Sequence, residues 1–425
     1  MSKLEKYTTY KDSGVEWLGK IPEHWGIKKL KHALKFTTGG TPSSGVEDYY
    51  NGEEPWVTIA DMTGRYIEKS HFISKKAIRE CNMQIVPKDS LLYSFKLSVG
   101  QVAFTTQNTY TNEAIASFYP ANNIDLNFWY YVLPVYVIRN ANKNIYGAYL
   151  LNQDLIKNAT IIFPPKEEQT KIASYLDGKT AQIDKAISQK EKLIELLKEQ
   201  KQITINEAVT KGLNKDVEFK DSAVEWLGQV PNHWDVIKVK NIFNLIIDPA
   251  PKANNEELLS IYTDIGVKPR KELEEKGNKA STTDGYWRVK KGDFIVNKLL
   301  AWMGAIGLSE YEGVTSPAYD ILRAKVPIVG RFYHELFRLK VFSEEMKKHS
   351  RGIMEMRLRL YFDKFGDILV PYPPKDEQVQ IVEYIENQTA KIDKAIELQQ
   401  NYISRLKEYK ASLIDSVVTG KVRVA

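Results

Sequence analysis

The sequence predicts an α+β protein with two tandem-duplicated globular domains, separated by two long helices that pair as an antiparallel coiled coil. Two observations carry this prediction. A Pro-Pro-Lys-(Glu/Asp)-Glu-Gln segment followed by a long apolar-periodic run occurs at residues 164–169 and again at 373–378, 209 residues later. Residues 11–25 likewise return as 220–234, with eleven of 15 positions identical at the same offset. The chain is therefore an internal duplication of a globular portion followed by a helix.

The two apolar-periodic runs end at about residues 210 and 419 and predict long helices. From Ile172 to Ala208, with three polar positions included, the first stripe makes ten steps over 36 residues, or 3.6 per step, which is one helix face. The proline pair before each run marks the helix start, because proline cannot lie inside a helix. The residues expected in the seam of the coiled coil are Ile172, Leu176, Ile183, Ile187, Ile194, Leu197, Ile381, Ile385, Ile392, Ile396, Ile403 and Leu406.

The polar interruptions of the stripes indicate how the helices pack. A helix of roughly 43 residues would be ~65 Å long and needs a partner, for which its own copy is the obvious candidate. Parallel, in-register packing would place Lys201 against Lys410. Antiparallel packing avoids this repulsion, although long lysines can also reach out of a seam. It would bring together these pairs: Lys201 with Thr389, Thr180 with Lys410, and Lys190 with Gln399.

Length and composition bound the organisation. A chain of 425 residues is too long for one compact core, and two to three domains are expected. The predicted segments are a first globular domain at 1–163, a helical spacer at 164–212, a second globular domain at 213–372 and a second helical spacer at 373–425. The net charge of +6 is a mild and, by itself, weak indication of an anionic partner.

Cysteine, histidine and hydropathy patterns point to a cytoplasmic protein without metal. Cys81 is the one cysteine, so no internal disulfide is possible and a reducing compartment fits. The six histidines are scattered without metal-ligand spacing, so no metal site is expected. The N-terminus lacks the apolar core of a signal peptide, and no run approaches the ~18 apolar residues that span a bilayer.

The first globular portion consists of short apolar runs broken by turn residues. Residues 55–60, 90–95 and 101–105 are typical of strands. The aromatic stretch 127–140 predicts a helix, with Pro134 inside it. Strands first and a helix later make this portion α+β.

The second globular portion, about residues 238–371, is more divergent but follows the same plan. Residues 292–297 correspond to 89–94, and 332–348 correspond to the aromatic helix. A retained scaffold with changed surface residues is expected of two modules that bind different versions of one kind of ligand.

The sequence offers little for catalysis. His24 and His233, in the repeated His-Trp elements, are better interpreted as structural anchors than as catalytic groups. We find no phosphate-binding loop, no glycine-rich cofactor loop, no nucleophile elbow and no His-Glu-x-x-His motif. Phe163 and Tyr372 precede the proline pairs, which excludes the Asn/Asp-Pro-Pro-aromatic signature of amino-methyltransferases. No catalytic residue is predicted, and an active site assembled from distant residues stays an open alternative.

Binding chemistry is better represented, in a basic stretch around Gly352 and its counterpart at residues 139–149. Arginine reads guanine bidentately, asparagine and glutamine read adenine, and lysine and arginine neutralise phosphates. For any single residue the alternative is a solvated charged surface. The predicted DNA-binding residues are Thr41, Lys96, Ser98, Gln101, Asn142, Lys143, Tyr146, Tyr149, Asn297, Lys298, Lys348, Arg351, Arg357 and Arg359.

Over essentially its whole length the chain resembles the specificity subunit of a type I restriction-modification system. The resemblance rests on the two helix starts at 166–169 and 375–378 and on the repeated Ile-Asp-Lys-Ala-Ile segments at 183–187 and 392–396. It also rests on Gly292-Asp293 and the Thr-Ser-Pro-Ala-Tyr segment that follows. The first portion departs from the pattern, with Lys88-Asp89-Ser90 at its Gly-Asp element.

The resemblance implies a function. Each globular domain would be a target-recognition domain for one half of a bipartite, asymmetric site on double-stranded DNA, and the helix pair would set the spacer. Two modification subunits that bind S-adenosylmethionine and methylate adenine would be partners, together with restriction subunits that use ATP and Mg²⁺. The specificity subunit itself would hold no cofactor and catalyse nothing.

Two other readings stay open. In the first, the chain is a coiled-coil scaffold that tethers protein partners without sequence-specific DNA binding. In the second, the chain itself methylates or cleaves DNA. Selection from a random DNA library separates the first alternative, and methyl transfer by the purified chain would support the second.

Overall fold

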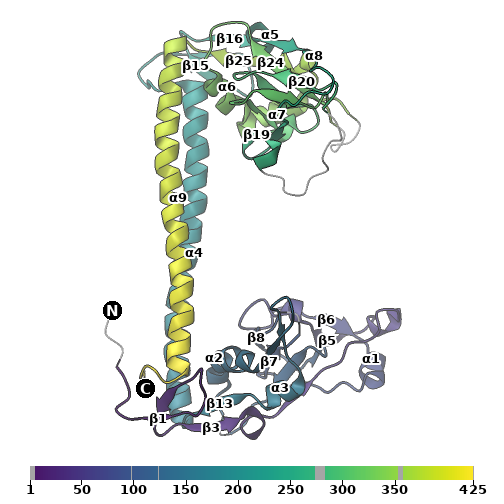
Figure 1. The fold of residues 1–425 in the computed structure, drawn as a ribbon, viewed down its shortest axis with the longest axis vertical. Coiled ribbons are helices and arrows are strands. Elements are labelled where there is room, and N and C mark those ends of the chain that lie inside the picture. The colour runs from purple at the N-terminus through teal and green to yellow at the C-terminus, as the bar shows by residue number, and fades with distance from the viewer. Residues whose placement is uncertain (1–4, 97, 123, 273–282, 353–357, 425) are drawn as a thin grey trace. The chain divides into compact units, whose positions relative to one another are not determined.

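The computed structural model describes residues 5–96, 98–122, 124–272, 283–352 and 358–424. The chain divides into two compact units: the first is Met1–Gln189 with Tyr402–Ala425, and the second is Lys190–Asn401. Each unit therefore combines one globular part with a piece of both long helices (Figure 1). Within the predicted segments 164–212 and 373–425, residues 166–211 and 375–418 form two continuous helices that the two units share.

The two long helices, α4 (Lys166–Lys211) and α9 (Lys375–Val418), contain 46 and 44 residues and begin directly after the proline pairs. Acidic residues occupy the first turn of each, where the helix dipole favours negative charge. Gly212 and Gly420 follow their ends with φ of +73° and +72°, the left-handed conformation that commonly terminates a helix. The starts expected at the proline pairs and the ends expected near residues 210 and 419 are therefore confirmed.

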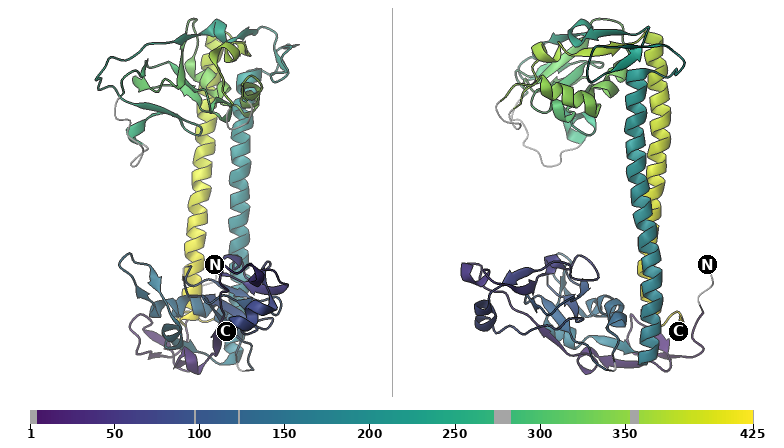
Figure 2. Two further views of the ribbon diagram at one scale, coloured as in Figure 1. Left: turned by 90° about the vertical axis from the view of Figure 1, so that its right-hand side faces the viewer. Right: turned by 180° about the vertical axis from the view of Figure 1, so that it is seen from behind.

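Within each unit, α4 and α9 lie side by side and run in opposite directions (Figures 1 and 2). In the second unit the partner number on α9 falls from 399 to 393 as α4 proceeds from 190 to 201. The polar contacts between the helices are Lys190 Nζ to Gln399 Oε1 at 2.9 Å, Lys201 Nζ to Asp393 Oδ2 at 2.7 Å and, in the first unit, Lys410 Nζ to Asp184 Oδ2 at 2.6 Å. Antiparallel pairing is thus confirmed.

The register differs slightly from the expected one. Lys190 bonds Gln399 as predicted. Lys201 and Lys410 instead bond aspartates one helical turn beyond the expected threonines, because an ionised carboxylate is the stronger partner within reach of a long side chain. Both lysines belong to ion pairs related by the offset of 209 residues.

The predicted seam residues are largely buried. Nine of the twelve are buried, and the three left half-buried are Leu197, Ile396 and Leu406. In the second unit, Ile381 and Ile385 share one hydrophobic core with Ile205 and Val209 and with the globular part. The helix ends are therefore built into the globular core, and burial there stabilises both.

The first globular part contains a four-stranded antiparallel sheet in the order β4-β10-β7-β8, and α2 packs against β7 and β8. A second sheet of three strands, β6-β5-β9, is built from strands that lie between β4 and β10 in the sequence. The strands expected at 90–95 and 101–105 are confirmed as β7 and β8. The strand expected at 55–60 is confirmed only as far as Val57, where β5 ends, because residues 59–61 form a 3-10 helix. The elements are β1 Tyr10–Asp12, β2 Lys20–Pro22, β3 Gly26–Lys29, β4 Phe36–Thr38, β5 Glu54–Val57, β6 His71–Ile73, α1 Lys75–Glu80, β7 Leu91–Ser94, β8 Val102–Phe104, β9 Tyr110–Thr111, β10 Ile115–Phe118, α2 Leu126–Tyr136, β11 Asn142–Lys143, β12 Tyr149–Leu150, α3 Gln153–Lys157 and β13 Thr160–Phe163.

The second globular part repeats this topology, with a sheet in the order β17-β24-β21-β22. In both parts the strand before the proline pair, β13 or β25, pairs with a strand near the start of the part, β3 or β16. The elements are β14 Phe219–Asp221, β15 Gln229–Pro231, β16 Asp235–Lys238, α5 Val239–Ile242, β17 Phe243–Ile246, β18 Leu259–Tyr262, β19 Gly266–Pro269, β20 Trp287–Val289, β21 Phe294–Asn297, β22 Ile306–Leu308, β23 Gly313–Thr315, β24 Tyr319–Ala324, α6 Gly330–Phe337, α7 Lys340–Lys348, α8 Phe362–Phe365 and β25 Leu369–Tyr372.

The helix expected over residues 332–348 is two helices in the structure. The expectation of one helix is corrected: Leu339, with φ of −63° and ψ of 142°, is extended and separates α6 from α7. Hydrophobic periodicity continues through the break, so the sequence pattern alone did not reveal it.

The turn before β7 and before β21 keeps its shape despite the sequence departure. Gly292 has φ of +92°, and Asp89 at the corresponding position has φ of +63°. Aspartate tolerates this left-handed conformation better than most residues. The missing glycine therefore changes the residue and not the turn.

The end of the chain completes the first unit. The Tyr136 hydroxyl donates to the Val418 carbonyl at 3.1 Å, and Gly420 lies against Pro22 and Trp25. The Arg423 amide donates to the Glu5 carbonyl at 2.8 Å. Residues from both ends of the chain thus meet in one compact unit.

Candidate nucleic-acid interface

The repeated histidines fix each globular part to the start of a long helix. His24 Nε2 lies 2.8 Å from Glu168 Oε2, and His233 Nε2 lies 2.8 Å from Glu377 Oε2. The adjacent Trp25 and Trp234 are fully buried. The interpretation of these elements as structural anchors agrees with this geometry.

The glutamine of each repeated helix start is buried. The Gln169 side-chain amide donates to the Pro164 carbonyl at 2.9 Å, and its carbonyl accepts from the Asp125 amide at 3.3 Å. Gln378 repeats both contacts, with the Pro373 carbonyl at 2.9 Å and the Val329 amide at 2.8 Å. Each glutamine thus bonds the carbonyl of the first proline of its pair and the backbone amide of the residue that precedes α2 or α6.

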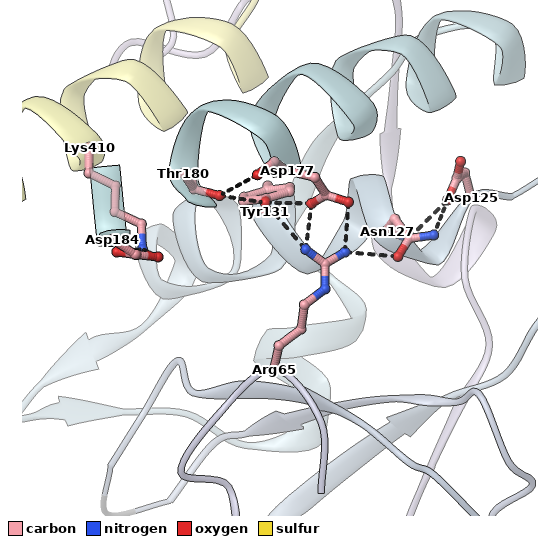
Figure 3. Close-up of polar contacts among 8 residues, drawn as sticks. All are labelled: Arg65, Asp125, Asn127, Tyr131, Asp177, Thr180, Asp184 and Lys410. Carbon is pink, nitrogen blue, oxygen red and sulfur yellow. Dashed lines mark hydrogen bonds and ion pairs between the residues drawn. The ribbon is translucent and has the colours of Figure 1, made fainter. Parts of the chain in front are cut away.

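A polar cluster attaches the first globular part to α4 (Figure 3). The Arg65 guanidinium bonds both carboxylate oxygens of Asp177, with Nη2 to Oδ2 at 3.0 Å. It also donates to Asn127 Oδ1 at 3.0 Å, and the Tyr131 hydroxyl donates to Asp177 Oδ1 at 2.6 Å. Since Asp177 lies on α4 while Asn127 and Tyr131 lie on α2, Arg65 joins both helices to its own loop.

Burial and charge set the protonation of this cluster. Burial alone would lower the pKa of Arg65, but the hydrogen bond and charge of Asp177 outweigh it and raise that pKa. Burial, reinforced by Asp177, raises the pKa of Tyr131 to about 12. At neutral pH Arg65 is therefore a charged guanidinium and Tyr131 a neutral phenol. Sequence analysis missed Arg65 because its partner lies 112 residues away.

The first predicted binding stretch folds into a short hairpin, residues 142–150, which we call the first hairpin. Asn142 pairs with Leu150, and Lys143 pairs with Tyr149. At the tip, Asn144 Oδ1 accepts from the amides of residues 146 and 148 at 3.0 and 2.9 Å. Gly147, with φ of +79°, supplies the left-handed position that the turn requires.

The tip of the first hairpin exposes two large apolar side chains. Ile145 is 91% exposed and Tyr146 is 87% exposed. Below them, Lys143 Nζ lies 5.2 Å from the centre of the Tyr149 ring. The predicted residues Asn142, Lys143, Tyr146 and Tyr149 are therefore brought together on one hairpin.

The second unit has a counterpart. Arg351 and Arg359 exchange two backbone hydrogen bonds of 2.9 Å, and they stand 209 residues after Asn142 and Leu150. Both arginines are exposed, and Arg351 Nη2 lies 3.5 Å from Asp363 Oδ2. We call the two paired ends that the structure describes, residues 351–352 and 358–359, the second hairpin. The predicted residue Arg357 lies outside the described residues.

Lys348 lies just before the second hairpin and is held by two carboxylates. Its ammonium is 3.1 Å from Glu225 and 3.1 Å from Glu345. Hydrogen bonds to Glu225 and Glu345 raise the pKa of Lys348. Its charge is therefore largely compensated within the protein.

Four further predicted residues lie on the first globular part. The Thr41 hydroxyl donates to Glu113, and Lys96 Nζ is 3.9 Å from the same carboxylate. Ser98 and Gln101 are exposed on the turn between β7 and β8, where the Gln101 amide donates to Ser94 Oγ at 3.0 Å. These residues form two small polar groups whose role in DNA binding stays a prediction.

Asn297 and Lys298 point inward. Asn297 is only 8% exposed, and its Oδ1 accepts from the Leu299 amide at 3.0 Å. Lys298 Nζ lies 3.2 Å from Asp320. Burial raises the pKa of Asp320, and the charge and hydrogen bond of Lys298 offset only part of that rise. Both side chains stabilise the turn after β21, which leaves them little freedom to contact a base.

Among the described residues, no group of three or more His, Cys, Asp or Glu side chains is arranged to hold a metal ion. In the same part of the chain, no helix has both the length and the apolar character that a bilayer crossing requires.

Comparison with protein-family models matches residues 22–199 to the type I restriction modification DNA specificity domain. A type I restriction enzyme specificity subunit of Methanocaldococcus jannaschii, MjaIX, is 30% identical over 204 residues, which are 46% of this chain and 46% of that relative. A second one from the same organism, MjaVIII, is 23% identical over 95% of this chain and 94% of its own length.

Solved structures share the fold. A chain from a structure titled for complex assembly and conformational transition of the type I R-M system aligns with a TM-score of 0.71 at 14% identity, covering 94% of this chain and 98% of that one. The HsdS subunit from Thermoanaerobacter tengcongensis aligns with a TM-score of 0.57 at 13% identity, covering 97% of this chain and all of its own.

Proposed function

We propose that this chain is a specificity subunit of a type I restriction-modification system and selects the DNA site of such a complex. Each globular part recognises one half of a bipartite, asymmetric sequence on double-stranded DNA, and the α4/α9 coiled coil sets the spacer. The observation that carries this proposal is the equivalence of the two hairpins. They occupy the same place in two copies of one fold but carry different side chains.

The duplication explains how two weak readers give one specific complex. Once one globular part has engaged its half-site, the other searches at a high effective concentration because the same chain holds it. Each mismatched base pair costs about 1–3 kcal/mol, so two half-sites multiply the discrimination. Insertion of whole turns into both helices would change the spacer and leave the half-sites unaltered.

The helices offer matching surfaces for two copies of one partner. We call the exposed charged residues beyond the first turn of each long helix that are identical at the offset of 209 the helix patch. They are Asp184 and Asp393, Lys185 and Lys394, Lys198 and Lys407, and Glu199 and Glu408. In each unit the patch contains one aspartate, two lysines and one glutamate. We assign it to the docking of two modification subunits.

We place the chemistry in those partners. S-adenosylmethionine, ATP and Mg²⁺ act on modification and restriction subunits in the cytoplasm, and this chain supplies recognition without catalysis. The absence of a nucleotide-binding or methyltransferase motif from its sequence supports this division.

Selection from a random duplex library tests the proposal. The full-length chain, co-expressed with the modification subunit of its system, is expected to enrich one gapped motif with two different halves. Mapping of methylated adenines in cells that carry both genes should return the same motif. Flat enrichment together with tight binding of protein partners would favour the scaffold alternative.

A further inference from the structure

The tip of the first hairpin is unusual for a water-exposed loop. Turn tips normally carry small or polar residues, whereas Ile145 and Tyr146 are 91% and 87% exposed. Because these two side chains are exposed, the protein does not gain the free energy that their burial would provide. An apolar tip on a polar hairpin therefore suits a surface that is buried only in a complex.

The hairpin is ordered before any contact. The Asn144 side chain bonds two backbone amides across the tip, and the strands pair through Lys143 and Tyr149. Its base is fixed as well: the Asn140 side-chain amide donates to the Leu155 carbonyl at 2.6 Å, and Leu151 is buried. Binding through a pre-ordered tip loses little conformational entropy.

The two units indicate which partner the tip contacts. A surface that binds two copies of one protein is expected to keep its residues in both repeats, which is the ground on which the helix patch was assigned to the modification subunits. The sequences between the paired ends do not: positions 145 and 146 are Ile and Tyr, whereas the residues 209 positions later in the sequence are Met and Glu. Divergence at equivalent places favours a partner that differs between the units, which under the proposed function is the DNA half-site.

The flanking residues favour DNA as well. Lys143 stands two residues before the tip, within reach of a phosphate when the tip enters a groove. Asn142 lies beside it at the strand end, and Arg351 and Arg359 take the equivalent strand positions in the second unit. Cations around an apolar tip are typical of proteins that insert a side chain between base steps.

We propose that Ile145 and Tyr146 form an apolar wedge that enters the duplex at one half-site and packs against the faces of the bases there, while Lys143 neutralises an adjacent phosphate. This inference rests on the proposed function and names the residues through which the first unit acts. Because base faces are alike in shape, the wedge selects deformable steps, such as pyrimidine–purine steps, rather than a hydrogen-bond pattern.

The test uses the full-length chain with its modification subunit and the duplex that the wild-type complex selects from the library. Ile145→Ala and Tyr146→Ala are each expected to weaken binding roughly 5- to 100-fold. The dependence of affinity on salt should stay unchanged, since no charge is removed. Lys143→Gln should instead reduce the salt slope by about one. Phe72→Ala, which removes a ring that is 51% exposed on β6, is the matched control and should change neither quantity.

A direct readout of the wedge is 2-aminopurine fluorescence, with the probe placed in turn at each adenine of the two half-sites. Apart from the adenines that the modification subunits would themselves extrude for methylation, wild-type binding should brighten one probe position by unstacking it, and Tyr146→Ala should abolish that signal while the other half-site stays selected. Unchanged affinity and fluorescence in both alanine variants would overturn the inference alone. So would retained DNA selection with weakened binding of the modification subunit. Flat library enrichment by the wild-type complex would overturn the proposed function itself.

Discussion

The two units enclose equivalent cavities, each of about 590 Å³, between the globular part and the helix pair, and their linings differ. In both, the helices contribute Thr, Asp, Lys and Ile at positions related by 209 residues. The globular side of the first cavity is formed by Tyr130, Tyr131 and Pro134. The corresponding residues of the second are His334, Glu335 and Arg338. The helix residues that line the two cavities are therefore the same, whereas the globular residues that face them differ.

The largest expected effect is the loss of stability when either of the two buried tryptophans is removed from its unit. Trp25→Ala and Trp234→Ala should each lower the free energy of unfolding of their own unit by about 3–5 kcal/mol, because a fully buried ring is lost. Hydrogen exchange, which resolves the two units, provides the measurement.

A matched pair sharpens this comparison. The Trp234 indole donates to Glu377 at 2.9 Å, whereas the buried Trp25 indole has no hydrogen-bond partner among the described residues. Trp234→Phe should therefore cost about 1 kcal/mol more than Trp25→Phe. Equal costs for the two phenylalanine variants would contradict this assignment.

Acid should distinguish the units next. Burial, together with Arg331 and Arg338, lowers the pKa of His334 to about 3, and its neutral Nδ1 accepts from the Leu308 amide at 3.1 Å. Between pH 6.5 and 3 the unfolded chain binds a proton that the folded unit does not. The second unit should therefore lose stability as pH falls, by roughly 2–3 kcal/mol between pH 6.5 and 4.5.

The first unit has Tyr130 at the corresponding position, so this histidine's contribution to the pH dependence of stability is missing there. His334→Gln should flatten the acid dependence of the second unit as followed by hydrogen exchange. A wild-type second unit whose stability is constant over this pH range would count against a neutral, buried His334.

Arg65→Lys should have a smaller effect, confined to the first unit. A lysine cannot reproduce the two parallel bonds to Asp177 together with the bond to Asn127 (Figure 3), so we expect a loss of about 1–2 kcal/mol. The control is Arg331→Lys, at an ion pair with Glu335 within one helix of the second unit. It should lower the free energy of unfolding by only a few tenths of a kcal/mol. Equal losses for the two variants would show that the Arg65 contacts do not fix the globular part to α4.

The smallest effect should be equal in both units. Lys201→Ala and Lys410→Ala each remove a partly exposed ion pair with Asp393 or Asp184, worth about 0.3–1 kcal/mol. Double-mutant cycles with the aspartates measure the two coupling energies. A difference above about 0.5 kcal/mol would break the equivalence of the two halves of the coiled coil.

Sequence reasoning was most successful where the physics is periodic or paired. The 3.6-residue stripe and the proline pairs gave the bounds of α4 and α9, and charge repulsion gave their antiparallel pairing. It was least successful for side-chain direction. Asn297 and Lys298 end a strand, and whether such side chains face solvent or the protein depends on the following turn. The Arg65 contacts join residues far apart in the chain, which no local pattern indicates.

The sequence predicts the position of the proposed binding segment but not its conformation. Residues 139–149 stood out as a binding segment from their polar and aromatic composition, but the pairing of Lys143 with Tyr149 and the exposure of Ile145 depend on a turn set by Asn144 and Gly147. A mixed polar and aromatic stretch is compatible with several loop conformations. The hairpin therefore came from the structure and not from the composition.

The first unit is completed by the last residues of the chain, and this has a consequence for biosynthesis. Asp184 on α4 meets Lys410 226 positions later, and Tyr136 bonds the Val418 carbonyl. At about 5–20 residues per second a ribosome needs on the order of 10–40 s to translate the intervening chain. Throughout that time the nascent first module and its apolar helix stripe lack their partner. The contacts of the first module with α9 must therefore form last, and a message truncated near its 3′ end would remove them from the N-terminal module.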